Sequence, residues 1–406
     1  MRCTQSGPSG TASLGARQCR MFMNRFALII GFAAAAFAQP GARRIVSPEV
    51  LPDHRITFRI GAPKAAEAVL TFSEGSPQSH PMTKGADGVW SVTIGPVAPE
   101  IYTYSFLIDG AKTIDLANPL AKIGASVDAS VVEVPGDPPR FDQVQQVPHG
   151  SIDIHTYASG VGKTQRGLYV YVPPDYYSQP AKRFPVLYLW HGGGGAEQDW
   201  SRDGRAGVIL DNLIAQKRAA PMLIVMPNNV PGTPAPGAMA AAGAPAVPAI
   251  GAGGANYPLL KRELIEDIIP FVARHYRTME NRESRAIAGL SAGGGTTLNV
   301  GLTSLDTFAW IAEFSSGIFG GVAGYGQYDI EKIAPGFYKD PAAINKRLKL
   351  FYMSVGTEDP RLPFQKKALE DFQSHKINVT FATFPGAHEW KVWRHSLADL
   401  APKLFR

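Results

Sequence analysis

Cysteine is almost absent from this chain. Only Cys3 and Cys19 occur among its 406 residues, and both precede the point at which we expect the chain to be cleaved. The mature chain would then hold no disulfide, no cysteine-based zinc site and no thiol nucleophile. Charged residues make up only 18%, and no basic cluster with interleaved aromatics occurs, so the sequence does not indicate a nucleic-acid partner.

Long hydrophobic runs are also lacking, apart from one near the start. Residues 26–37 are apolar, arginines precede them, and Ala38 completes a small-residue cleavage site. This pattern predicts a signal peptide over residues 1–38, of which residues 1–20 read as a non-native leader. Its removal deletes four arginines and lowers the net charge from +6 to +2. The prediction is a secreted or periplasmic protein without a membrane segment; an uncleaved anchor is the alternative.

Residues 44–134 are rich in short β-type segments with turns between them. The segments are residues 55–60, 68–72, 89–94 and 102–108. This spacing predicts a small all-β, immunoglobulin-like sandwich of roughly 90 residues. We expect Trp90 and Tyr104 to pack in its core rather than to form a sugar-binding platform, because strand aromatics usually point inward.

After a linker over residues 135–149, the segment 150–406 alternates strands with helices. The expected strands are residues 167–172, 185–190, 222–226, 285–288, 310–314, 348–354 and 378–384. The expected helices include residues 207–217, 259–276 and 362–374. Several strands are apolar throughout, which is typical of strands covered on both faces. The segment is therefore predicted to be an α/β domain with a doubly wound, mainly parallel sheet.

Residues 230–255 differ from the rest of this segment. They carry no charge, are rich in alanine, proline and glycine, and show no periodicity. We interpret them as a flexible loop or lid after the strand at 222–226, and a disordered insertion without a role is an equal alternative.

The sequence Gly289-Leu-Ser291-Ala-Gly293 follows an apolar strand and opens a helix of small residues. A nucleophile elbow requires this strand–turn–helix context, because the tight turn lifts the serine hydroxyl above the sheet. Ser291 is therefore the predicted nucleophile. Its partners should follow in the order acid, then histidine.

The loops after the last two strands supply these partners. Asp359 follows the strand at 348–354, and His388 follows the strand at 378–384. We expect His388 to take the proton of Ser291, and Asp359 to fix the imidazole tautomer. Glu358 is the competing acid. The other late histidines, His375 and His395, fall in helical segments and are disfavoured.

Four consecutive glycines, Gly192 to Gly195, end the strand at 185–190. Glycines let backbone N–H groups approach a substrate oxygen, so we expect an oxyanion hole from Gly193, with Gly194 as second choice, and the N–H of Ala292. Gly194 and Trp390 are predicted to contact the substrate. No Lys-Ser/Thr pair follows the glycines, which disfavours a phosphate-binding P-loop.

Several runs of the sequence together carry a family resemblance. They are residues 167–174, 184–195, 209–215, 221–228, 268–272, 276–278, 288–294 and 386–390. Over residues 150–406 the chain resembles the putative-esterase (esterase D-like) α/β-hydrolases, most closely the bacterial feruloyl and acetyl-xylan esterases of carbohydrate esterase family one. The resemblance implies the triad Ser291, Asp359 and His388. Residues 44–134 resemble the early-set (isoamylase N-terminal-like) modules, a carbohydrate-binding type.

The leading hypothesis is hydrolysis of feruloyl or acetyl esters on plant cell-wall xylan, without metal or cofactor, because this chemistry needs only water. The polymer or a small ester is the expected partner, and the oligomeric state stays open. An enterochelin-type siderophore esterase, an acyltransferase of the same fold and a sugar-binding protein with an inactive hydrolase are the alternatives. We expect the front segment to tether the enzyme to polymer; the alternative is that it lends side chains to the active-site rim.

Overall fold

A computed structural model describes residues 44–74, 76–123, 127–235, 237, 256–320 and 329–406. The expected signal peptide and most of the 230–255 insert lie outside these residues. Residues 45–406 form one compact unit. Among the described residues, none of the helices combines the length and the apolar composition needed to cross a membrane.

The front region consists of two antiparallel sheets packed face to face. One sheet has the order β1-β2-β6-β5, and the other has the order β4-β3-β7-β10-β9, with β8 paired to β7. Aromatic rings join the sheets: Phe58 lies 4.6 Å from Tyr104 and 5.9 Å from Phe72, centroid to centroid. The strands are β1 (Glu49–Val50), β2 (Ile56–Gly61), β3 (Ala68–Glu74), β4 (Ser76–Pro81), β5 (Thr83–Lys84), β6 (Val89–Ile94), β7 (Ile101–Ile108), β8 (Ala111–Thr113), β9 (Ala121–Ile123) and β10 (Val127–Glu133).

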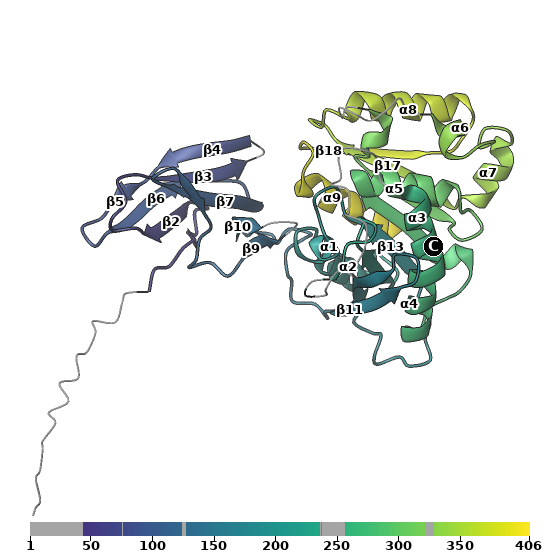
Figure 1. Cartoon of the computed structure of the whole chain (residues 1–406), viewed down its shortest axis with the longest axis horizontal. Coiled ribbons are helices and arrows are strands. Elements are labelled where there is room, and N and C mark those ends of the chain that lie inside the picture. Colours follow the sequence, from purple (N-terminus) through teal and green to yellow (C-terminus); the bar gives the residue numbers. More distant parts are fainter. Residues whose placement is uncertain (1–43, 75, 124–126, 236, 238–255, 321–328) are drawn as a thin grey trace, which may run out of the picture. The chain divides into compact units, whose positions relative to one another are not determined.

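The larger region is built on an eight-stranded mixed sheet (Figure 1) of order β11-β12-β14-β13-β15-β16-β17-β18. The pairs β11·β12 and β12·β14 are antiparallel, and every neighbouring pair from β14 to β18 is parallel. The carboxyl ends of β13, β15, β17 and β18 therefore meet at one edge of the sheet. The strands are β11 (Ser151–Ser159), β12 (Thr164–Val172), β13 (Val186–Trp190), β14 (Leu223–Pro227), β15 (Arg285–Leu290), β16 (Trp310–Phe314), β17 (Leu350–Gly356) and β18 (Thr380–Phe384).

Helices cover both faces of this sheet. Alternate residues of β13 join different cores: Tyr188 belongs to the core that contains Leu298 and Phe372, and Leu187 belongs to the core that contains Ile209 and Val392. The first core is closed by α3, α4, α5 and α8, and the second by α1, α2 and α9. The helices are α1 (Asp199–Arg202), α2 (Ala206–Ala215), α3 (Tyr257–Arg262), α4 (Ile269–His275), α5 (Ala292–Leu302), α6 (Ile330–Ile333), α7 (Pro341–Arg347), α8 (Leu362–Ser374) and α9 (Trp390–Leu400), with a π-helix at Glu263–Ile268.

The expected α/β class, with an all-β region before it, is confirmed. The first strand of the large sheet, β11, was not among the expected strands. It lies at the sheet edge, where Ile154 is 66% exposed, so its apolar residues do not mark a buried face. The helix expected over residues 259–276 is divided by the π-helix, where the backbone hydrogen-bond step widens.

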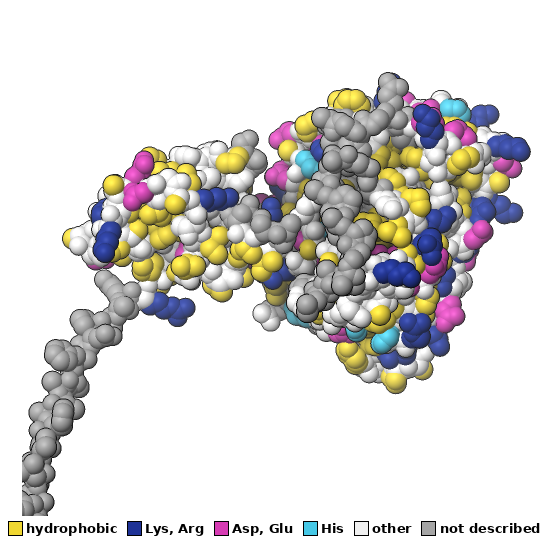
Figure 2. All heavy atoms as spheres, in the orientation of Figure 1, with side chains coloured by type: hydrophobic (Ala, Val, Ile, Leu, Met, Phe, Trp, Pro, Cys, Tyr) yellow, Lys and Arg dark blue, Asp and Glu magenta, His cyan; other side chains and the backbone are white. Residues whose placement is uncertain are grey.

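Charge is spread over the surface of the described residues. On the face drawn in Figure 2, Lys and Arg side chains are interspersed with Asp and Glu side chains. In the part of the chain shown there, this face carries no continuous basic stripe of the kind that follows a nucleic-acid backbone.

Candidate active site

Ser291 occupies the sharp turn between β15 and α5. Its φ is 51° and its ψ is −115°, a backbone conformation that L-residues rarely adopt. The turn is held because the Ser291 N–H donates to the carbonyl of Phe314 at 2.8 Å. A strained serine at the end of a central strand is the geometry that the sequence pattern predicts.

The structure brings Ser291, His388 and Asp359 together. Nε2 of His388 lies 2.9 Å from Oγ of Ser291, and Nδ1 of His388 lies 2.8 Å from Oδ2 of Asp359. Because the carboxylate can only accept, Nδ1 carries the imidazole proton and Nε2 is free to accept the serine proton. This is the arrangement that the predicted roles of nucleophile, base and orienting acid require.

Asp359, the acid of these three residues, is almost fully buried. Burial opposes its charge, but hydrogen bonds from His388 and from the N–H of Arg361, together with the Arg361 guanidinium, lower the pKa of Asp359 to about 2. Glu358, the competing acid in the sequence, is exposed. The geometry favours Asp359 over Glu358.

The glycine loop after β13 lies against the nucleophile elbow. A Cβ on Gly293 would come within 2.4 Å of the carbonyl oxygen of His191, and one on Gly192 would lie 3.4 Å from Cβ of Ser291. Ala292 is the first residue of α5, so its N–H has no partner inside the helix. Gly193 and Gly194 are exposed and line the same cavity as Ser291. The glycine loop and the start of α5 therefore lie beside Ser291.

His191 holds this loop in place. Its Nε2 accepts from the N–H of Asn229 at 2.8 Å, so its Nδ1 carries the proton and donates to the carbonyl of Gly192 at 2.7 Å. Burial lowers the pKa of His191 to about 4, which keeps the ring neutral. Oδ1 of Asn229 accepts from Thr296 on α5 at 2.7 Å, which links the loop to the helix of the nucleophile.

A cavity of about 830 Å³ opens in front of these groups. Gly193, Gly194, Ser291 and His388 line it, as does Trp390 at the start of α9. The ring of Trp390 lies 5.2 Å from that of Trp200 in an edge-on arrangement. Trp390 and Gly194, predicted to contact substrate, therefore both line this cavity.

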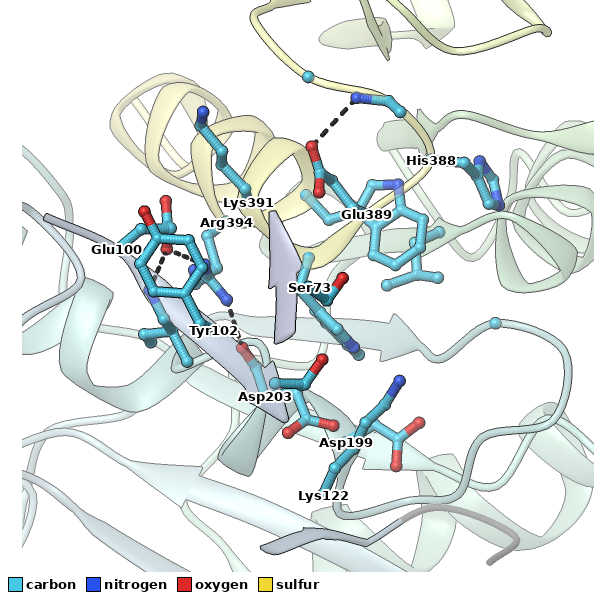
Figure 3. A pocket seen from close by; sticks show the side chains of 18 of the residues that line it. Ser73, Glu100, Tyr102, Lys122, Asp199, Asp203, His388, Glu389, Lys391 and Arg394 are labelled. Atoms are coloured by element: carbon cyan, nitrogen blue, oxygen red, sulfur yellow. Dashed lines mark hydrogen bonds and ion pairs between the residues drawn. The ribbon is translucent and has the colours of Figure 1, made fainter. Parts of the chain in front are cut away.

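Two carboxyl groups lie on the opposite side of the cavity from His388 (Figure 3). Asp199 and Asp203 both come from the segment around α1. Burial, with Asp203 nearby, raises the pKa of Asp199 to about 7, and burial also raises the pKa of Asp203. Oδ1 of Asp199 is buried and without a hydrogen-bond partner among the described residues. The two carboxyl groups make this side of the cavity polar.

Residues of the front sheets complete the cavity wall. Ser73, Tyr102 and Lys122 line it (Figure 3). Arg394 of α9 holds this arrangement, since it forms ion pairs with Glu100 and with Asp142, the latter at 2.7 Å.

Sequence reasoning missed the polar cavity residues Asp199, Asp203 and Lys122. Asp199 stands four positions after the glycine run, so its proximity to that loop gave a local signal. Lys122 lies on β9 of the front region, whereas Ser291 follows β15 of the large sheet. Nothing in the sequence near Lys122 indicated that it lies at this cavity. Across the described ranges, no group of three or more His, Cys, Asp or Glu is placed to hold a metal ion.

Comparison with protein families and curated proteins gives two matches of interest. Residues 159–404 match the family model described as "Putative esterase". The chain is 29% identical over 376 residues to an endo-1,4-beta-xylanase/feruloyl esterase of Xylanibacter ruminicola, covering 91% of this chain and 47% of the relative. The chain thus spans about half the length of that relative.

Solved structures show the same fold. A mutant of the feruloyl esterase module from Clostridium thermocellum, complexed with sinapinate, is 25% identical with a TM-score of 0.50, covering 66% of this chain and 91% of the module. The enterobactin esterase of Shigella flexneri is 14% identical with a TM-score of 0.58, covering 86% of this chain and 93% of its own. At 14% identity, the second likeness concerns the fold alone.

Proposed function

The chain belongs to the putative esterase family, and on this premise we propose that it removes feruloyl or acetyl groups from xylan outside the cytoplasm. The observation that carries the proposal is the hydrogen-bonded chain Ser291–His388–Asp359 at the edge of a cavity. The relative named as a xylanase and feruloyl esterase supports the choice of acyl group and polymer.

The reaction follows from the positions of the protons. His388 takes the hydroxyl proton at Nε2 as Oγ of Ser291 attacks the ester carbonyl, and it returns this proton to the leaving alcohol. Asp359 stabilises the imidazolium that forms between these steps. The acyl group stays on Ser291 until water, activated by the same imidazole, releases it.

Charge that develops on the carbonyl oxygen needs donors. We assign them to the N–H groups of Gly193 and Ala292, with Gly194 as the second choice for the loop donor. Each donor of this kind contributes about 2.7–4 kcal/mol to transition-state stabilisation. The positive end of the α5 helix dipole acts in the same direction.

The cavity supports a large, neutral ester. Its volume of about 830 Å³ lies in the upper range of small-molecule sites, and Trp390 provides an apolar wall for an aromatic acyl group. The acidic side can hydrogen-bond to sugar hydroxyls, which both donate and accept. We therefore assign Trp390 to the acyl group, and Asp199 and Asp203 to the sugar.

A siderophore esterase is the second candidate, because the likeness to the enterobactin esterase extends over 86% of this chain. The charges of the cavity argue against it. A catechol siderophore that holds iron is anionic, whereas basic side chains do not outnumber acidic ones in the wall, even when Asp199, with its pKa raised to about 7, is left out of the count. The acids are Glu100, Asp199, Asp203, Glu358 and Glu389, and the bases are Lys122, Lys391 and Arg394. A neutral ester fits such a wall better.

Steady-state kinetics of the full chain test the proposal. The substrates are feruloylated xylan, acetylated xylan, a long-chain ester and a catechol-lactone siderophore, with Ser291→Ala as the blank. We expect the highest kcat/KM on one of the two xylan esters. Preference for the siderophore lactone would overturn the substrate assignment, and product found on an added alcohol rather than on water would indicate an acyltransferase. N-terminal sequencing of exported protein tests the location: a chain beginning at Gln39 supports export.

A further inference from the structure

A glutamate lies buried behind the candidate triad and has no part in the reaction described above. Glu313 is on β16, which is hydrogen-bonded to the nucleophile strand β15, and its register partner there is Gly289. Its side chain is completely buried. A carboxyl group in such a place needs either a countercharge or a proton.

Among the residues that the structure describes, no countercharge contacts Glu313, and its hydrogen bonds come from neutral donors. Oε2 of Glu313 accepts from the N–H of Ser316 at 2.7 Å and from Nε2 of Gln365 at 3.1 Å. Nε2 of Gln365 also lies 3.4 Å from the carbonyl oxygen of Ser316, which fixes the orientation of the amide. The remaining oxygen of each side chain is its Oε1.

These two remaining oxygens are both acceptors without a donor. Oε1 of Glu313 and Oε1 of Gln365 are buried and have no hydrogen-bond partner among the described residues. Gln365 is itself completely buried. Two acceptors cannot pair with each other unless one of them carries a hydrogen, and only the carboxyl group can gain one. A single proton on Glu313 would satisfy both atoms.

We propose that Glu313 is protonated on Oε1 and forms a closed carboxylic acid–amide pair with Gln365, which positions the loop that carries Asp359. In this pair the hydroxyl of Glu313 donates to Oε1 of Gln365, while Nε2 of Gln365 donates to Oε2 of Glu313. Gln365 lies in the first turns of α8, the helix that begins directly after the Asp359 loop. Glu313 is thus a positioning residue for the triad acid.

The electrostatic surroundings agree with the protonated form. Burial raises the pKa of Glu313 to about 8 against the hydrogen bonds from Gln365 and Ser316, and the carboxylate of Asp359 acts in the same direction as burial. The ionisable groups on the elements packed around it are Asp359 with its partner Arg361, and Tyr352 on β17, whose own pKa Glu313 helps to raise. Helix α5 contains no ionisable residue; the ionisable residues of α8 are exposed, apart from the half-buried Asp371, which accepts a hydrogen bond from Tyr338.

The pair gives the enzyme a limit at alkaline pH. Above pH about 8, loss of the proton would break the hydrogen bond to Oε1 of Gln365 and place a second negative charge near Asp359. The turnover number should then fall as Glu313 loses its proton, and this fall is not caused by His388.

Infrared difference spectroscopy tests the protonation state directly, without reference to activity. The spectrum of the full chain minus that of Glu313→Gln, both at pH 7, should show the carbonyl band of a protonated carboxyl group, shifted in D₂O. Glu370→Gln, on the exposed side of the same helix α8, is the matched control and should show a carboxylate difference only. A carboxylate-only difference for Glu313→Gln would overturn the proposal.

A pH titration of kcat tests the positioning role, on an ester without an ionisable phenol and with acid release as the readout. Glu313→Gln keeps a neutral pair, so it should retain kcat within about threefold at pH 7 and lose the alkaline step. Gln365→Met removes the amide at similar volume and should lower kcat with little change in KM. An alkaline step that persists in Glu313→Gln would contradict the proposal. If that variant does not fold, loss of the infrared band of the unaltered chain near pH 8 still decides it. These readouts stand even if the ester is not xylan-linked.

Discussion

Nδ1 of His388 lies 2.8 Å from Oδ2 of Asp359, while the neighbouring Glu358 is exposed. The choice between two adjacent acids in the sequence thus becomes a geometric one. Only Asp359 is buried and hydrogen-bonded to the imidazole, so only Asp359 can fix its tautomer.

The first prediction concerns this acid. Asp359→Asn should lower kcat by about 10³-fold or more, because an amide can donate to Nδ1 and so favour the wrong tautomer. Glu358→Gln is the matched control and should change kcat by less than about threefold. Kinetics on a small aryl ester, with circular dichroism to check folding, measure both. A larger loss in Glu358→Gln would reverse the assignment.

The second prediction concerns the contact between the glycine loop and the nucleophile helix. Gly293→Ala would place a Cβ 2.4 Å from the carbonyl oxygen of His191, so the elbow must shift. We expect kcat to fall by about tenfold or more. Gly301→Ala, on the same helix, meets only side-chain atoms of Ile287 and Ile311 at 3.1 Å or more and should have little effect. Equal effects of the two changes would show that the close approach does not matter to catalysis.

The sequence predicted the core strands and the groups that meet at the sheet edge, because local patterns encode both. The apolar runs of β13 to β17 mark strands covered on two faces, and the elbow motif has a fixed strand–turn–helix context. Two edge strands escaped prediction, although the edge strand β18 did not: β11 exposes Ile154, and β4 contains two prolines. Such strands lack the burial that creates a pattern.

Glu313 was overlooked for a different reason. It interrupts an apolar strand, and a charged residue inside a buried run is itself a signal that the sequence offered. Its partner Gln365, however, lies 52 residues away in the chain. Only the fold reveals that the two side chains meet.

The third prediction concerns stability and pH. Burial lowers the pKa of His191 from 6.5 to about 4, so between these values the unfolded chain binds a proton that the folded chain does not. The contribution of His191 to the free energy of unfolding should therefore be complete above pH 6.5. It should decrease as the pH falls toward 4, by up to about 1.4 kcal/mol per pH unit. Denaturant unfolding of the full chain and of His191→Gln at several pH values measures the slope. An unchanged slope in His191→Gln would contradict the assigned neutral state.

The fourth prediction concerns the front sheets. All six aromatic residues of 44–134 are buried, so no aromatic platform for sugar is exposed in this segment. The cavity is instead lined by Ser73, Tyr102 and Lys122. This favours the hypothesis that the front segment lends side chains to the active-site rim over the hypothesis that it tethers the enzyme to polymer. A chain beginning at Pro148 should then lose activity on both a small soluble ester and xylan.

If the front segment only tethers the enzyme to polymer, the chain beginning at Pro148 should keep its turnover of the small ester. Lys122→Ala in the full chain tests the same hypothesis more specifically, because it removes the side chain of one cavity-wall residue and leaves the sheets intact. It should raise KM. Circular dichroism of the shortened chain must show that it is folded before its kinetics are compared.

Covalent trapping of Ser291 tests the central claim most directly. The full chain is treated with an alkyl fluorophosphonate, and its peptides are analysed by mass spectrometry alongside residual ester hydrolysis. The account predicts one adduct, on Ser291, with a parallel loss of activity, no adduct in Ser291→Ala, and a kcat for that variant lower by about 10⁴-fold or more. An adduct on another residue, or a Ser291→Ala variant that keeps its activity, would contradict it.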